Sequence, residues 1–337
     1  MNLLIISPAS LRTRPESYGG MEFMAFNLMR GLETLGHNVD LAARLDSDLP
    51  VRGKLIPYSD EKELPDIFNG QFNHYQCGID LTHDKTLSMA YPDWPIICNF
   101  QVMSVSHTNG INPVFISHGQ KRTKFPNVEG PVIHYGLNFD EYPLYEDERD
   151  NYILYLGQII PEKRVEWACQ VAIETNTPLK AYGPQWCPPW YRDALRQYEE
   201  EFPELISIND SVGGQEKLEL LQKATMLIHP IGAMDWCEAG AICALESLAT
   251  GTPVLSTSNG CMPEYIISGV NGWMGNSVDR LSSLLLDYKI MVQSNESPIT
   301  PRGCRESIEQ EYNYIRFAKE YVDLAQKVAN GLRWNVR

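Results

Sequence analysis

The sequence has little positive charge and no long apolar run. Its 28 lysines and arginines are outnumbered by 43 aspartates and glutamates, which gives a net charge of −15 at pH 7. An extended nucleic-acid surface needs clustered basic residues, so nucleic acid is not expected as a partner. No stretch approaches the roughly 18 apolar residues that a membrane span requires, and the first residues contain no basic leader. We therefore expect neither a transmembrane segment nor a secretory signal.

The cysteines lack a metal-binding or redox pattern. Eight are scattered along the 337 residues, and no two form a C-x-x-C pair, so their spacing supports neither a zinc site nor a redox motif. Several lie in apolar runs, where a free thiol behaves as a small buried hydrophobe. This usage indicates reduced cysteines and a cytoplasmic protein.

Two α/β patterns follow one another along the chain. The apolar segment from Leu3 to Ser7 precedes a loop rich in proline, serine and glycine. Apolar residues then recur at helical spacing from Met21 to Leu35, and Val39 to Ala43 reads as the next strand. Strand, helix and strand in this order predict a right-handed crossover and a parallel sheet. The pattern restarts at Tyr152 to Leu156, and a chain of this length suits two domains better than one. The sequence thus predicts an α/β protein with two Rossmann-like, doubly wound domains.

Composition and periodicity set the expected domain limits. The first domain should cover residues 1–145 and the second 146–314, with the acidic, turn-rich segment from Tyr142 to Asp150 as the linker. The final helical pattern, from Ile315 to Leu332, carries an apolar stripe that must be buried. We therefore expect residues 315–337 to pack back toward the first domain. Further strands are expected at 79–81, 96–100, 114–116, 132–133, 179–182, 206, 226–229 and 254–256.

Two glycine-containing loops are candidates for anion binding, because ligands in such folds bind at the carboxyl ends of the strands. Gly19 and Gly20 precede the first helix, where the backbone can approach a ligand and free N–H groups can hold an anion. A tight turn with no ligand is the alternative. In the second loop, Gly157 frees the backbone, and Lys163 and Arg164 open a helix. Because a cation there opposes the helix dipole, a bound anion explains the pair better than helix stability does, although plain solvation remains open.

A third loop carries two carboxylates. Glu238 precedes the small residues Ala239, Gly240 and Ala241, whose amides can cradle a phosphate. Glu246 lies on the helix that follows and interrupts an otherwise apolar face, where a carboxylate is costly unless it is paired. Glu246 can accept hydrogen bonds from ribose hydroxyls and Glu238 from sugar hydroxyls. A partly exposed glutamate at a helix edge is the alternative.

The stretch from Tyr152 to Trp273 resembles the donor domain of the retaining glycosyltransferase family 4, whose fold is named GT-B. The acceptor half is matched more loosely by Gly19-Gly20 and by Ile133 to Asn138. The family's donor motifs are met in order by Gly157, Glu162 and Lys163 in the Gly-Arg-x-x-x-Glu-Lys-Gly loop, Glu238 and Glu246 in Glu-x7-Glu, Gly251 to Val254 in Gly-Thr-Pro-Val, and Pro263, Glu264, Asn271 and Gly272 in the final segment.

The resemblance implies a GT-B enzyme with its active site between two domains. It transfers a sugar from a UDP- or GDP-sugar to the hydroxyl of a glycan, a lipid-linked acceptor or a small molecule, with retention and without a metal or other cofactor. Lys163 would neutralise the diphosphate, Glu238 would hold the transferred sugar and Glu246 the ribose. The other implied donor contacts are Gly19, Gly20, Gly157, Arg164, Gly183, Val212, Ala239, Gly240, Ala241 and Ile242.

Two positions depart from the family pattern. Gln158 stands where the family commonly has an arginine beside the lysine, so its catalytic position lacks a charge that Arg164 could supply instead. Gln101 stands where a histidine is common, and it can still hydrogen-bond a sugar hydroxyl. His83, which follows a predicted strand, is a further candidate for contact with acceptor or sugar; a structural role is the alternative.

Two other functions stay open. One is a transferase that glycosylates a hydroxylated base in DNA, which the acidic composition disfavours. The other is a catalytically silent binder of nucleotide sugars, which Gln158 and Gln101 motivate. Asp46-Ser47-Asp48 spells the Asp-x-Asp motif of metal-dependent glycosyltransferases, but its place before Leu49-Pro50 suits a surface loop.

Overall fold

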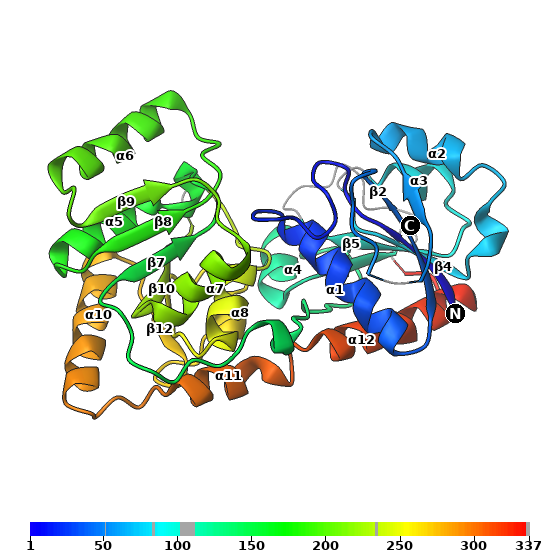
Figure 1. The fold of residues 1–337 in the computed structure, drawn as a ribbon. Helices are drawn as coiled ribbons and strands as arrows, with labels where there is room; N and C mark the ends of the chain where they lie inside the picture. Colours follow the sequence, from blue (N-terminus) through cyan, green and yellow to red (C-terminus); the bar gives the residue numbers. More distant parts are fainter. Residues whose placement is uncertain (51, 83–84, 102–111, 233–234, 335–337) are drawn as a thin grey trace. The chain divides into compact units, whose positions relative to one another are not determined.

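The chain forms two compact units in a computed structural model that describes residues 1–50, 52–82, 85–101, 112–232 and 235–334 (Figure 1). The first unit comprises Met1–Pro15, Gly19–Asn138 and Glu311–Arg337, and the second comprises Glu16–Tyr18 and Phe139–Gln310. These bounds lie a few residues before the expected limits at 145 and 314. None of the helices in the described residues combines the length and the apolar character that a membrane crossing requires.

The first unit is built on a six-stranded parallel sheet with the order β3-β2-β1-β4-β5-β6. Leu3, Leu4, Ile5 and Ile6 of its central strand are all fully buried, because helices cover both faces of the sheet. The strands are β1 (Asn2–Ile6), β2 (Asn38–Ala43), β3 (Leu55–Pro57), β4 (Cys77–Asp80), β5 (Ile96–Phe100) and β6 (Pro113–Phe115). The helices are α1 (Gly20–Thr34), α2 (Leu64–Ile67), α3 (Thr86–Ala90), α4 (His118–Lys124) and α12 (Tyr314–Ala329).

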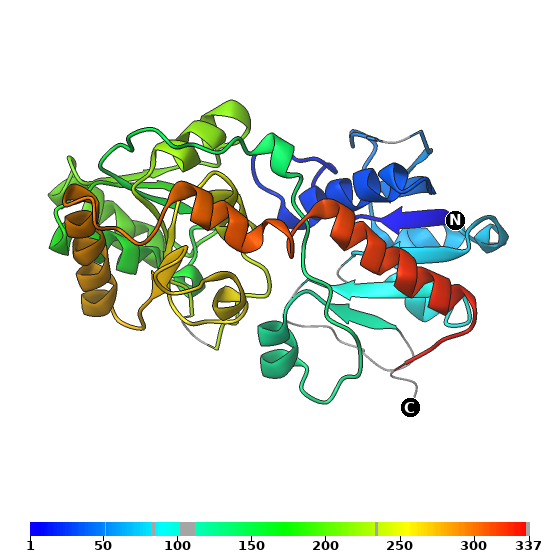
Figure 2. The same ribbon diagram turned by 90° about the horizontal axis from the view of Figure 1, so that it is seen from below.

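The last helix, α12, belongs to the first unit although it is far from it in sequence. It packs against α1 and against strands β4 and β5 (Figure 2). The two helices approach closely at Gly31, where a Cβ atom would lie 2.6 Å from the Cβ of Ala318. A small residue at this crossing lets the apolar stripe of α12 reach the unit.

The second unit repeats the same design with the strand order β12-β11-β10-β7-β8-β9, again all parallel. Helix α5 packs with α10 and α8 with α11 (Figure 1). The strands are β7 (Ile153–Leu156), β8 (Leu179–Tyr182), β9 (Ile206–Asn209), β10 (Met226–His229), β11 (Val254–Ser256) and β12 (Gly272–Met274). The helices are α5 (Val165–Glu174), α6 (Pro189–Glu201), α7 (Gly214–Lys223), α8 (Ile242–Ala249), α9 (Met262–Tyr265), α10 (Val278–Gln293) and α11 (Pro301–Glu309).

Three sequence expectations differ from the structure. Strands β3 and β12 were not predicted, and each is a three-residue strand at the edge of its sheet. The strand expected at residues 132–133 is a single bridge between Val132 and Phe115. The segment from Tyr142 to Asp150 is not a free linker, because it packs within the second unit, where the Arg149 guanidinium donates to backbone carbonyls including Gly251 O.

Candidate functional site

A buried ion pair joins two of the predicted site residues in the second unit. Lys163 ends a short 3-10 turn (Pro161–Lys163), and Glu238 lies in the loop between β10 and α8. The distance from Lys163 Nζ to Glu238 Oε2 is 2.5 Å, and the two side chains are only 10% and 9% exposed. Trp236 Nε1 donates to the same oxygen at 3.3 Å, and the ammonium lies 5.4 Å from the centroid of the Trp236 ring. The pair therefore places a cation and a hydrogen-bond acceptor next to each other in a buried environment.

Glu238 stays ionised in this setting. Burial alone would raise the pKa of its carboxyl, but the charge of Lys163 and the hydrogen bonds from Lys163 and Trp236 outweigh burial and lower it. His229, at the carboxyl end of β10, behaves oppositely: burial lowers its pKa to about 4, Lys163 adds to that effect, and Glu238 opposes it. The imidazole is therefore neutral near pH 7.

The backbone around Glu238 is held by its neighbours. Asn259 accepts a hydrogen bond from Glu238 N at 2.8 Å and donates to Trp236 O at 2.9 Å, while Cys261 N donates to Glu238 O at 2.8 Å. Gly260 has a φ of +54°, and a Cβ there would lie 2.0 Å from Glu238 O. Only glycine fits this close approach, so the loop holds the Glu238 carboxylate at a defined position.

Glu246 forms a second buried cluster on α8. Its Oε1 accepts hydrogen bonds from Lys217 Nζ of α7 at 2.6 Å and from the Tyr142 hydroxyl at 2.7 Å. The glutamate is 3% exposed, so these partners meet the requirement that a buried carboxylate be paired. Burial and the carboxylate raise the pKa of Tyr142 well above its usual value. The sequence indicated the need for a partner but named neither Lys217 nor Tyr142.

The pKa of Cys243, in the first turn of α8, is affected by both charged clusters. Lys163, Glu238, Glu246 and Lys217 all act on its thiol, whose pKa burial raises to about 12. No side chain caps the start of α8 at Ala241. Among the amides expected to hold phosphate, that of Ala241 donates to Cys261 Sγ at 3.4 Å. The start of α8 thus contains the residues Ala241 and Ile242 that the sequence predicts as donor contacts.

The loops after β7 and β8 pack backbone against backbone. Gly157 N donates to Tyr182 O at 3.1 Å, Ile159 N donates to Pro184 O at 3.0 Å, and Gly157 has a φ of +158°. A Cβ on Gly183 would lie 1.6 Å from Gly157 O. The predicted contacts Gly157 and Gly183 are therefore neighbours, and each is a glycine for a steric reason.

Replacing Gly183 with alanine is expected to lower the free energy of unfolding by about 2–3 kcal/mol, because the added methyl group must displace the Gly157 carbonyl. Gly269→Ala is the control: its φ is +77° and nothing lies within 4 Å of the new Cβ. That change carries only a conformational cost of about 1 kcal/mol. Urea unfolding of both variants makes the comparison, and equal losses would exclude a steric role for Gly183.

The remaining donor candidates of the second unit occupy varied environments. The guanidinium of Arg164 lies 4.2 Å from the centroid of the Trp167 ring, and its backbone has a φ of +52°. The backbone carbonyl of Gln158 accepts from the Tyr155 hydroxyl at 2.8 Å. Val212 is buried, between β9 and α7. The structure thus places the Arg164 guanidinium over an aromatic ring.

Candidates in the first unit are described within that unit alone. Gly19 has a φ of +144° and precedes α1, whose start at Gly20 has no side-chain cap. Gln101 Oε1 accepts from the Tyr135 hydroxyl at 2.9 Å, while its Nε2 is buried without a partner among the described residues. His83 lies outside the described residues.

The Asp-x-Asp sequence is engaged in ion pairs. Asp46 accepts two hydrogen bonds from Arg44, at 2.7 and 2.6 Å, and Asp48 pairs with Arg12 at 2.8 Å. Both carboxylates thus have arginine partners, as expected for a surface loop.

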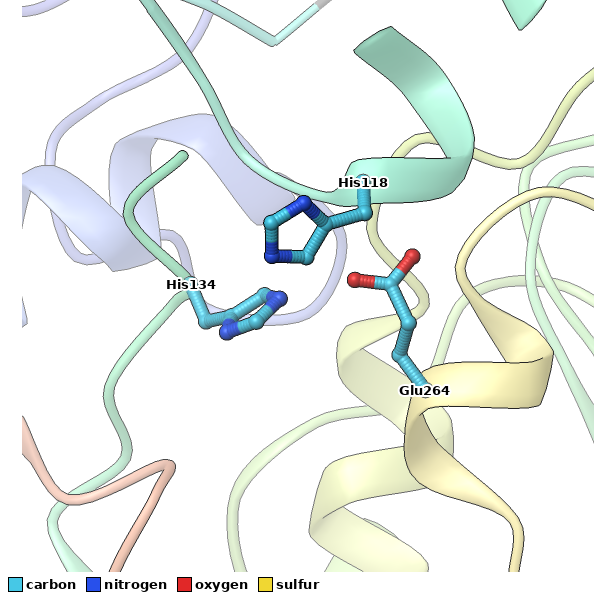
Figure 3. Close-up of side chains that lie close together, drawn as sticks. All are labelled: His118, His134 and Glu264. Carbon is cyan, nitrogen blue, oxygen red and sulfur yellow. The ribbon is translucent and has the colours of Figure 1, made fainter. Parts of the chain in front are cut away.

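Two histidines of the first unit lie side by side. Figure 3 shows His118, at the start of α4, and His134, whose ring centroids are 5.7 Å apart; Glu264, also drawn, belongs to α9 of the second unit. His134 Nδ1 lies 3.1 Å from Glu311 Oε1. This contact ties the segment before Asn138 to the start of the C-terminal part of the same unit.

Part of the second unit matches a glycosyltransferase family model, and the chain has similar curated relatives. Residues 194–288, which include Glu238 and Glu246, match the family model described as glycosyl transferases group 1. WcaL of Salmonella typhimurium, provisionally named a colanic acid biosynthesis glycosyltransferase, is 27% identical over 172 residues. That alignment covers 47% of this chain and 41% of WcaL, so the chain matches less than half of the length of this relative.

Solved structures resemble both units over nearly the whole chain. AviGT4, a glycosyltransferase involved in avilamycin A biosynthesis, has a TM-score of 0.78 with 21% identity and covers 99% of each chain. HepE of Anabaena, solved in complex with UDP, has a TM-score of 0.75 with 11% identity over 97% of this chain and 100% of HepE. These likenesses confirm the predicted fold class: two Rossmann-like α/β units with the fold of GT-B glycosyltransferases.

Proposed function

We propose that the protein is a retaining glycosyltransferase of family 4 that transfers a sugar from a UDP- or GDP-sugar to an acceptor hydroxyl without a metal ion. The observation that carries the proposal is the buried pair Lys163–Glu238 within a unit whose sequence matches group 1 glycosyl transferases. A sugar diphosphate offers an anion to the lysine and hydroxyl donors to the glutamate. A neighbouring cluster around Glu246 supplies an acceptor for the ribose.

In this proposal the protein acts mainly through electrostatics. The bond between the anomeric carbon and the β-phosphate oxygen breaks while the acceptor oxygen bonds to the same face of that carbon. The acceptor's proton passes to the departing phosphate oxygen, so no protein base is needed. Lys163 stabilises the negative charge that develops on the leaving diphosphate, and its burial strengthens this effect. Glu238 and Glu246 orient the sugar and the ribose.

A silent binder of nucleotide sugars is the second candidate, because Gln158 brings no charge to the diphosphate. The two functions separate in one experiment. The purified protein is first screened against UDP-glucose, UDP-galactose and GDP-mannose by thermal shift, since a ligand that binds only the folded state raises Tm. The best donor is then incubated with acceptor glycans and assayed for release of nucleoside diphosphate. Release supports the transferase, binding without release supports the binder, and no shift with any nucleotide sugar contradicts both.

Replacing Glu246 with alanine is expected to weaken donor binding by about 1–3 kcal/mol, the cost of leaving ribose hydroxyls and the partners of the carboxylate unpaired. Tyr142→Phe is the matched control, because it removes one hydrogen bond to Oε1 and keeps the carboxylate. We expect it to change donor affinity by less than about half of that amount. Calorimetry with the best donor makes the measurement, and undiminished binding by Glu246→Ala would remove this residue from the site.

A further inference from the structure

His229 is buried next to Glu238, and its Nε2 atom makes no hydrogen bond to the described residues. It ends strand β10 and is 1% exposed. Its Nε2 lies 4.0 Å from Glu238 Oε2, which is beyond hydrogen-bond range, and has no partner among the described residues. A buried polar atom without a partner is costly, so its position next to a proposed sugar-binding carboxylate calls for an explanation.

The surroundings of His229 allow its ring proton to face Glu238. Cys243 Sγ lies 3.9 Å from Nδ1, and burial raises the pKa of this thiol to about 12, so the sulfur keeps its hydrogen and can donate it to Nδ1. With that pairing, the proton of the neutral ring is on Nε2, facing Glu238. The other groups facing the ring are Lys163, from the loop before α5, and Tyr155 of β7, whose ring centroid is 6.2 Å away. The ring thus presents an N–H to the carboxylate.

Lys163 forms an ion pair with Glu238 in this structure and would pair with the diphosphate in the donor complex. Its ammonium carries one charge, and a diphosphate is the stronger competitor for it because it carries more negative charge. When the ammonium turns toward phosphate, Glu238 loses its main partner while remaining buried. Trp236 Nε1 keeps its hydrogen bond to Glu238 Oε2, but an ionised buried carboxylate that has lost its cation needs a further donor. The Nε2–H of His229 lies 4.0 Å from the same oxygen and can be that donor.

We propose that His229 is a positioning residue for the donor sugar: as the diphosphate engages Lys163, Glu238 closes onto the Nε2–H of His229, and this bond holds the carboxylate toward the sugar hydroxyls. The inference rests on the proposed function of the same site. It makes His229 specific for the sugar part of the donor, because the nucleoside and the phosphates are held by other groups. A nucleoside diphosphate leaves the place of the sugar to water, which can donate to Glu238 instead of His229, so its binding should depend on His229 much less.

Two substitutions at His229 test this role by calorimetry with UDP-glucose or GDP-mannose, whichever the parent binds more tightly, and with the corresponding nucleoside diphosphate. His229→Leu removes the donor and keeps an apolar side chain, and we expect it to weaken nucleotide-sugar binding about tenfold, the scale of one hydrogen bond to a charged group. Binding of the nucleoside diphosphate should stay within about twofold. His229→Gln keeps an N–H near the place of Nε2 and should restore nucleotide-sugar binding to within about threefold of the parent.

The possible results distinguish failure of the inference from failure of the proposed function. If the parent binds no nucleotide sugar, the proposed function and the inference both fall. If the parent binds and His229→Leu binds the nucleotide sugar equally well, only the inference is overturned. The inference is also overturned if His229→Leu weakens binding of the nucleotide sugar and of the nucleoside diphosphate equally. It is overturned as well if His229→Gln loses as much nucleotide-sugar affinity as His229→Leu. Should His229→Leu fail to fold, Cys243→Ala removes the thiol that orients the ring, and nucleotide-sugar affinity unchanged by it would contradict the proposal.

Discussion

Replacing Lys163 with methionine is expected to lower kcat about 100- to 1000-fold, the loss seen when a single group that stabilises transition-state charge is removed. The charge on the leaving diphosphate develops as the glycosidic bond breaks, so the lysine contributes more to the transition state than to the bound donor. KM for the donor should therefore change less than kcat, because the Glu246 cluster remains. Initial rates with the donor found by thermal shift make the measurement. An unchanged kcat would remove Lys163 from the chemistry.

The same substitution should also destabilise the fold. Glu238 would be left buried without its cation, which costs about 3–5 kcal/mol when one partner of a buried pair is removed. The double variant Lys163→Met with Glu238→Gln should recover most of this loss, because the remaining amide carries no charge. Lys223→Met is the control, since that lysine is exposed at the end of α7. A single variant as stable as the parent in urea would mean that the ion pair contributes nothing to folding.

Much of the architecture follows from buried strands that read as continuous apolar runs. The segments 96–100 and 226–229 were predicted with the bounds that the structure shows, and every residue in them is buried. In a doubly wound sheet such strands are covered on both faces, so sequence and burial agree. The strands that were missed, Leu55–Pro57 and Gly272–Met274, lie at sheet edges. Most residues of these two strands are only partly buried or exposed, so they leave no apolar pattern in the sequence.

The candidate site, too, could be predicted from the sequence only in part. Lys163 and Glu246 were predicted because a cation at a helix start and a carboxylate on an apolar helix are each costly without a partner. Glu238 was predicted because it precedes a turn of small residues and fits the Glu-x7-Glu spacing. Their partners were not, because the pairings join distant segments: Lys217 is 29 residues from Glu246, and Tyr142 is 104 residues from it. His229 was predicted only as the end of a strand. Its role depends on three side chains from different elements, and no local pattern encodes that arrangement.

Acidification is expected to weaken the fold through His229. The pKa of this histidine is 6.5 when unperturbed and about 4 in the folded protein, where burial is the main cause of the decrease. Between these values the unfolded chain binds more protons than the folded one, so the free energy of unfolding falls as the pH drops. The contribution is complete above pH 6.5 and lost by about pH 4; at 1.36 kcal/mol per pKa unit it amounts to about 3 kcal/mol. Urea unfolding of the parent across this range measures the total slope.

The contribution of His229 to the pH dependence of stability is obtained by subtracting the unfolding curve of His229→Leu from that of the parent. Burial raises the pKa of Glu22 and of Glu166, and these carboxyls favour the folded state as the pH drops, which opposes the histidine. Both are present in the parent and in His229→Leu, so the difference between the two unfolding curves reports His229 together with its coupling to Glu238. We expect the leucine variant to be nearly as stable as the parent at pH 7 and more stable by about 3 kcal/mol at pH 4. Parallel curves would show that the imidazole is protonated in the folded state as easily as in the unfolded chain, and would contradict its burial as a neutral donor facing Glu238.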